Sequence, residues 1–93
     1  MIVVFTNAAR ADLEEIHAYI ARESVERAQD VVAIIQLATE RLAIFPKSGR
    51  PGRRRDTREL VLHRLPYILP YRVIGDRVMI LRVQHTSSQW PDR

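Results

Sequence analysis

Apolar residues recur at two different spacings along this chain, and the change of spacing separates a helical first half from a strand-rich second half. The apolar run at residues 2–5 predicts a short strand. Apolar residues spaced by three or four positions then predict a helix over about residues 9–20. A wider apolar stripe predicts a longer second helix that Pro46 and Gly49 end, with Ala28, Val31, Val32, Ile35, Ala38, Leu42 and Phe45 on its buried face.

Polar residues mark the start of each predicted helix. Thr6 or Asn7 can accept a hydrogen bond from the free N–H groups of the first helix, and Ser24 can do the same for the second. Only a few residues separate the two helices, so we expect them to form an antiparallel hairpin.

The second half alternates in the manner of strands. Strands are expected at residues 59–65, 67–74 and 78–85, and Gly75-Asp76 predicts a tight hairpin turn between the last two. In the last strand, strict alternation places residues 79, 81, 83 and 85 on one face. Pro70 lacks an N–H group, so it should lie at a bulge or face an unpaired side. Residues 46–56, which hold two prolines and two glycines, should have no regular structure.

The order of elements predicts an α+β fold in a single domain that spans residues 1–93. An N-terminal strand and a helical hairpin precede a three-stranded antiparallel sheet. The hairpin should cover one face of the sheet, which leaves the other face and the preceding loop available for binding.

Composition narrows the class of protein. A chain of 93 residues that is 46% apolar is large enough for one packed core and too small for two. No apolar run approaches the roughly 20 residues that a membrane span needs, so no membrane association is expected. The absence of cysteine excludes disulfides and thiolate metal sites and favours a cytoplasmic location.

The positive charge is concentrated in one segment. Residues 47–64 hold seven basic and two acidic residues, a balance of +5, whereas the chain as a whole carries +4. Guanidinium groups can bind phosphates or acidic side chains, although a charged loop can also be no more than a solvated turn. We expect partner binding here, without a choice among RNA, DNA, a ribosome and an acidic protein, through Arg50, Arg53, Arg54, Arg55 and Arg58.

Catalytic and cofactor signatures are weak. No histidines or carboxylates stand at a metal-ligand spacing, so neither a metal nor another cofactor is expected. His85 could transfer protons, but a structural hydrogen bond is the favoured role. Trp90 is either a packing anchor or an interface anchor, and with Arg82 and His85 it forms a second expected partner-binding group.

Several segments together resemble the ParE-type toxins of the ParE/RelE superfamily, which belong to type II toxin–antitoxin systems. The resemblance covers nearly the whole chain. In the first half, the resemblance is carried by residues 9–20 and by the end of the second helix, with Phe45-Pro46 and Gly49-Arg50. In the second half, it is carried by the strands with Arg58-Glu59-Leu60, Pro66-Tyr67 and Tyr71-Arg72-Val73, and by the C-terminal segments Arg82-Val83-Gln84-His85 and Trp90-Pro91.

The resemblance implies one of two activities. RelE-like members cleave mRNA in the ribosome with basic and polar side chains, whereas ParE-like members poison DNA gyrase. Ile68 stands where a RelE-like nuclease would carry a basic residue, and residues 86–89 replace the basic and aromatic cluster of that branch. If the chain were such a nuclease, the candidates for catalysis would be Arg64, Arg72, Arg82 and His85.

The favoured interpretation is therefore a ParE-like toxin that is not an enzyme. Its expected partners are a cognate ParD-like antitoxin with an acidic tail and DNA gyrase, and direct nucleic-acid binding is not favoured. The alternatives are a ribosome-dependent mRNA endonuclease and a degenerate relative that only binds its antitoxin.

Overall fold

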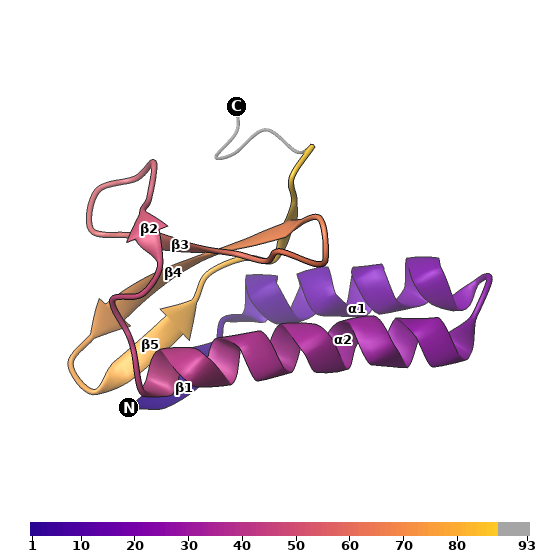
Figure 1. The fold of residues 1–93 in the computed structure, drawn as a ribbon, viewed down its shortest axis with the longest axis horizontal. Helices are drawn as coiled ribbons and strands as arrows, with labels where there is room; N and C mark the ends of the chain where they lie inside the picture. The colour runs from indigo at the N-terminus through magenta and orange to yellow at the C-terminus, as the bar shows by residue number, and fades with distance from the viewer. Residues whose placement is uncertain (88–93) are drawn as a thin grey trace.

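The computed structural model describes residues 1–87 and has the expected α+β architecture (Figure 1). Helix α1 (Asn7–Ala21) and helix α2 (Val25–Glu40) form the predicted antiparallel hairpin and lie side by side along one face of the sheet. The helix caps are also confirmed. The Thr6 hydroxyl accepts from the Ala9 N–H at 3.1 Å, and the Ser24 hydroxyl accepts from the Arg27 N–H at 3.1 Å.

The sheet is larger than the three strands expected from the sequence. Its order is β1-β5-β4-β3-β2, and β6 pairs with β4. The N-terminal strand joins it in parallel with β5, whereas all other pairs are antiparallel. The strands are β1 (Ile2–Phe5), β2 (Arg50–Pro51), β3 (Arg58–Val61), β4 (Tyr67–Ile74), β5 (Arg77–Ile80) and β6 (Gln84–His85).

Three predicted boundaries were wrong. Helix α2 ends at Glu40 and tightens into a 3₁₀ turn, η1 (Arg41–Ala43), so Phe45 is 60% exposed instead of lying on the buried stripe. Pro46 accounts only for the end of the helical turns at Phe45, because a proline disfavours helical geometry in the residue before it. The segment 46–56 contains strand β2, which pairs with the first two residues of β3. Strand β3 stops at Val61 and does not reach residue 65.

The last predicted strand is interrupted by a bulge. Tyr71 pairs with Ile80, but Ile68 pairs with Gln84, so two residues of β4 face the three residues 81–83. The extra residue reverses the alternation, and Val83 is therefore buried on the same side as Ile80 rather than on the opposite face. Pro70 lies opposite the bulge, as predicted, and its carbonyl accepts from the Leu81 N–H at 2.8 Å.

The core lies between the helices and the inner face of the sheet. It is closed by large buried side chains from β4, β5 and α2, among them Tyr71, Leu69, Ile80 and Ile35. Gly75 adopts a φ of 58°, which confirms the predicted turn between β4 and β5. Within residues 1–87, no helix is both long and apolar enough to cross a membrane.

Candidate functional site

The helix-ending segment is tied to the sheet by Tyr71. The buried phenol hydroxyl donates to the Pro46 carbonyl at 2.8 Å and accepts from the Gly49 N–H at 2.9 Å. A Cβ atom at Gly49 would lie 2.6 Å from that hydroxyl, so only glycine fits this close approach. Burial raises the pKa of Tyr71, although the Gly49 hydrogen bond and the charge of Arg58 act in the opposite direction.

The basic loop is anchored by a buried carboxylate. Glu59 is 3% exposed, and its Oε1 lies 2.9 Å from Nη2 of Arg50 and accepts from Nε of the same arginine at 3.0 Å. Its Oε2 accepts from the Arg53 N–H at 3.3 Å. Glu59 therefore holds β2 and the start of the loop that follows it, and Figure 1 shows the β2–β3 loop projecting away from the helices.

The five arginines that the sequence assigned to partner binding do not share one role. Arg50 is paired with Glu59. Arg58 donates through Nη1 to the carbonyls of Lys47 at 3.1 Å and Gly49 at 2.9 Å. Arg53, Arg54 and Arg55 are exposed. Two of the five thus support the shape of the loop, and the other three lie on its surface.

A groove of about 610 Å³ runs between the end of α2 and strand β3. Because β2 pairs only with Arg58 and Glu59, the rest of the outer edge of β3 has no strand beside it in the described part of the chain. We call this the helix–strand groove. Its apolar lining includes Ile34, Leu42, Phe45, Leu60 and Leu62, and its basic lining is Arg41, Arg50, His63 and Arg64.

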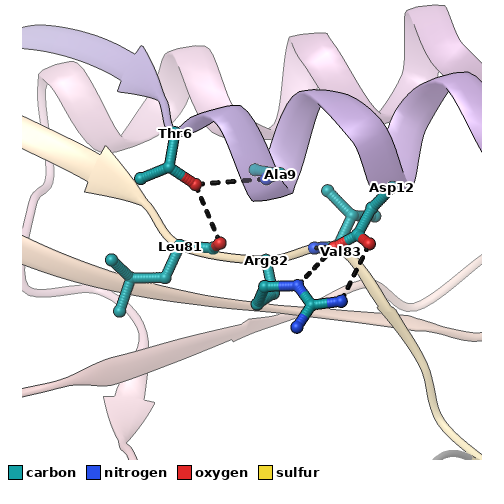
Figure 2. A network of polar contacts seen from close by, with 6 residues as sticks. All are labelled: Thr6, Ala9, Asp12, Leu81, Arg82 and Val83. Atoms are coloured by element: carbon teal, nitrogen blue, oxygen red, sulfur yellow. Dashed lines mark hydrogen bonds and ion pairs between the residues drawn. The ribbon is translucent and has the colours of Figure 1, made fainter.

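Arg82 is held by Asp12 of helix α1 (Figure 2). Asp12 accepts from Nε of Arg82 at 2.8 Å, from Nη2 at 3.0 Å and from the Val83 N–H at 2.8 Å. The Asp12 hydrogen bond raises the pKa of Arg82. Beside this clamp, the Thr6 hydroxyl donates to the Leu81 carbonyl at 2.9 Å. These two sets of hydrogen bonds fix the start of α1 to the bulge between β5 and β6.

His85 lies at the end of β6, beside Tyr67. Their rings meet edge to face with centroids 5.6 Å apart, and Nδ1 of His85 accepts from the Ser87 N–H at 3.1 Å. His85 and Arg82 line a groove of about 730 Å³ between α1 and β6, together with Glu15, Ile16, Tyr19 and Tyr67 among others. Trp90, the third member of this expected group, lies outside the described residues.

The four nuclease candidates line three different cavities. Arg64 lines the helix–strand groove, and Arg82 and His85 line the groove between α1 and β6. Arg72 lines a third hollow of about 570 Å³, which we call the basic hollow, with Lys47, Asp56 and Arg58 among its walls. Within residues 1–87, no group of three histidines or carboxylates could hold a metal ion.

Sequence reasoning missed the two carboxylates that organise these surfaces, Asp12 and Glu59. Glu59 left a signal, because it is one of only two acidic residues in a strongly basic segment. Asp12 left none, since its partner Arg82 lies 70 positions away in the chain.

Comparison with known proteins bears on this arrangement. The model of the family described as ParE toxin of type II toxin–antitoxin system, parDE, matches residues 3–90. The chain belongs to the ParE toxin family. It is 51% identical over 87 residues to the putative toxin Y4kP of Sinorhizobium fredii, covering 94% of this chain and 90% of the relative. It is 36% identical over 85 residues to toxin RelE2 of Caulobacter vibrioides, covering 91% and 94%.

Two solved structures resemble this ParE-family toxin. A chain of the chromosomal ParDE system from P. aeruginosa matches with a TM-score of 0.82 at 32% identity, covering 91% of this chain and 95% of that one. A chain of the toxin–antitoxin complex RelBE2 from Mycobacterium tuberculosis matches with a TM-score of 0.62 at 31% identity, covering 90% and 95%. Both branches of the ParE/RelE superfamily are therefore represented among its structural neighbours.

Proposed function

We propose that this ParE-family toxin inhibits growth by binding DNA gyrase and that it does not cleave RNA. The dispersal of the nuclease candidates carries the proposal. In-line cleavage needs a base, an acid and phosphate-binding groups within hydrogen-bond reach of one phosphodiester. Arg64, Arg72 and the pair Arg82–His85 line three separate cavities.

The chemistry of these side chains supports the same conclusion. Arg82 is already engaged by both oxygens of Asp12, so recruiting it for a phosphate would leave that carboxylate without its partner. On the open face of the sheet, Val61 pairs with Ile68, which places two aliphatic side chains where a nuclease would need cations. This surface suits contact with a protein better than chemistry on RNA.

The helix–strand groove is the surface we assign to a cognate antitoxin. Its neighbourhood includes unusually exposed apolar side chains, with Ile44 72%, Leu37 62% and Phe45 60% exposed. The lining cations Arg41 and Arg64 complement an acidic partner. The solved relatives are a ParDE system and a RelBE2 toxin–antitoxin complex. Exposed apolar side chains beside cations suit an acidic, amphipathic segment of the antitoxin. That segment could be helical, or extended along the open edge of β3.

A pair of assays separates the proposed activity from its alternative. The purified toxin should block DNA supercoiling by gyrase, and addition of the antitoxin should restore it. The same preparation should leave mRNA intact on translating ribosomes in primer extension. Supercoiling that continues at a molar excess of toxin would reject gyrase as the target.

The second candidate is a RelE-like ribosome-dependent nuclease. Its support is the 36% identity to toxin RelE2 and the match to RelBE2. This second candidate function predicts codon-dependent cleavage of mRNA. The cleavage should disappear in Arg72→Ala or His85→Ala variants that still fold. Cuts of that kind would replace the gyrase proposal.

Charge reversal tests the role of the loop in antitoxin binding. Changing the three exposed arginines Arg53, Arg54 and Arg55 to glutamate should slow association by about tenfold or more and flatten its salt dependence, because exposed charges act mainly through electrostatic steering. The matched control reverses three exposed arginines outside the loop, Arg22, Arg27 and Arg77, and should have a smaller effect. Equal rates for the loop variant and the wild type would remove the loop from the interface.

A further inference from the structure

The basic hollow brings together cations from three separate segments. Lys47 follows η1, Arg58 begins β3, and Arg72 lies in the second half of β4. Asp56 is the acidic residue in its lining. The hollow shares no lining residue with the helix–strand groove, so the two can be tested separately.

The cations of the hollow lack anionic partners. Within residues 1–87, no salt bridge involves Lys47, Arg58 or Arg72, whereas Arg50 and Arg82 each have a carboxylate. The Nε atom of Arg72 is buried and has no hydrogen-bond partner in the described part of the chain. A buried donor without an acceptor costs about 1–3 kcal/mol, so the unpaired Nε of Arg72 needs an explanation.

One of the cations is already fixed in position. Nη1 of Arg58 donates to the carbonyls of Lys47 and Gly49, and the Tyr71 hydroxyl holds Gly49 in turn. Because these hydrogen bonds restrain the guanidinium before any ligand arrives, binding costs less conformational entropy. The hollow therefore has a restrained wall and an excess of positive charge, and one of the arginines that line it has a buried, unsatisfied Nε.

We propose that the basic hollow is a phosphate-binding site formed by Lys47, Arg58 and Arg72. Three cations from separate segments match a group that presents several anionic oxygens, whereas a single carboxylate is satisfied by one arginine fork. The phosphate could be a free anion or a phosphodiester of DNA, since both present anionic oxygens to these cations. This site is independent of the identity of the toxin's protein target.

The site is tested by titrating the whole chain with inorganic phosphate at constant ionic strength. ¹H–¹⁵N spectra are recorded at each phosphate concentration. We expect saturable shifts confined to residues around Lys47, Thr57, Arg58 and Arg72. Lys47→Gln, at an exposed position, and Arg72→Gln should each weaken phosphate binding by about tenfold. Arg77→Gln, an equal loss of charge at an exposed position on β5, should change it less than twofold.

Lys47→Gln keeps the test decisive if Arg72→Gln does not fold. The proposal is wrong if the Arg77 control weakens phosphate binding as much as Lys47→Gln. It is also wrong if acetate binds as tightly as phosphate, which would indicate a site for carboxylates of a protein partner.

A short DNA duplex then identifies the source of the phosphate. If the source is DNA, Lys47→Gln removes one cation from a DNA phosphate, and the slope of log K against log salt should become shallower by about 0.9. An unchanged slope, together with weakened phosphate binding, supports the site with a free phosphate anion as its ligand.

Discussion

Removing one oxygen from Tyr71 should cost a large fraction of the stability of this domain. Tyr71→Phe keeps the buried ring and deletes only the hydroxyl, which joins the Pro46 carbonyl to the Gly49 N–H. Gly49 is itself buried, so water cannot replace the missing acceptor without entering the core.

The expected magnitude follows from those two hydrogen bonds. A buried donor left unsatisfied costs about 1–3 kcal/mol, and an ordinary hydrogen bond contributes about 1 kcal/mol. Together they predict a loss of about 2–4 kcal/mol in the free energy of unfolding. For a domain of this size the melting temperature should fall by roughly 10–20 °C.

Urea and thermal unfolding of the wild type, Tyr71→Phe and Tyr67→Phe measure this effect. Tyr67 is the matched control, because its ring contacts His85 while its hydroxyl makes no hydrogen bond within residues 1–87. We expect the control to lose less than about 0.5 kcal/mol. If both variants lose the same amount, the Tyr71 hydroxyl does not hold the end of the helical region to the sheet.

Three further outcomes are expected. Asp12→Ala should cost about 2 kcal/mol in urea unfolding, because it leaves Arg82 without its acceptor, whereas Asp30→Ala at an exposed position of α2 should be nearly neutral. The contribution of Tyr71 ionisation to stability should be constant below pH 10 and fall above it, because burial raises the pKa of Tyr71 above its ordinary value of 10.0 and the folded chain retains a proton that the unfolded chain has lost. Circular dichroism melts across alkaline pH should therefore show a smaller loss for Tyr71→Phe than for the wild type. Gly49→Ala should destabilise by about 1–3 kcal/mol, because the new methyl would lie 2.8 Å from the Glu59 carbonyl oxygen, and a melting temperature equal to the wild type would contradict this.

The features that could be predicted from the sequence depend on local spacing. The caps at Thr6 and Ser24, the helical hairpin and the turn at Gly75 each need only a few neighbouring residues, and all are present. Strand β4 (Tyr67–Ile74) has the predicted bounds because Pro66 and Gly75 delimit it.

The features that could not be predicted join distant parts of the chain. Nothing near residues 2–5 indicates that β1 pairs in parallel with β5. Pro70 indicated a bulge or an unpaired side near β4, but alternation in the last strand gave no sign that the extra residue lies between β5 and β6. For the site, the concentration of arginine in the sequence was visible, but the pairing of Arg50 with Glu59 and of Arg58 with backbone carbonyls was not.

These pairings decide how toxicity experiments on the chain can be interpreted. Arg50 and Arg82 each pair with a carboxylate that is mostly buried, so replacing either one leaves that carboxylate without its cation and weakens the fold. Loss of toxicity in those variants therefore reports stability as much as target binding. Exposed Arg55 and Lys47 carry no such cost, because neither takes part in a salt bridge among the described residues. Substitutions at Arg55 and Lys47, with unchanged melting temperatures, are the ones that can separate recognition from folding.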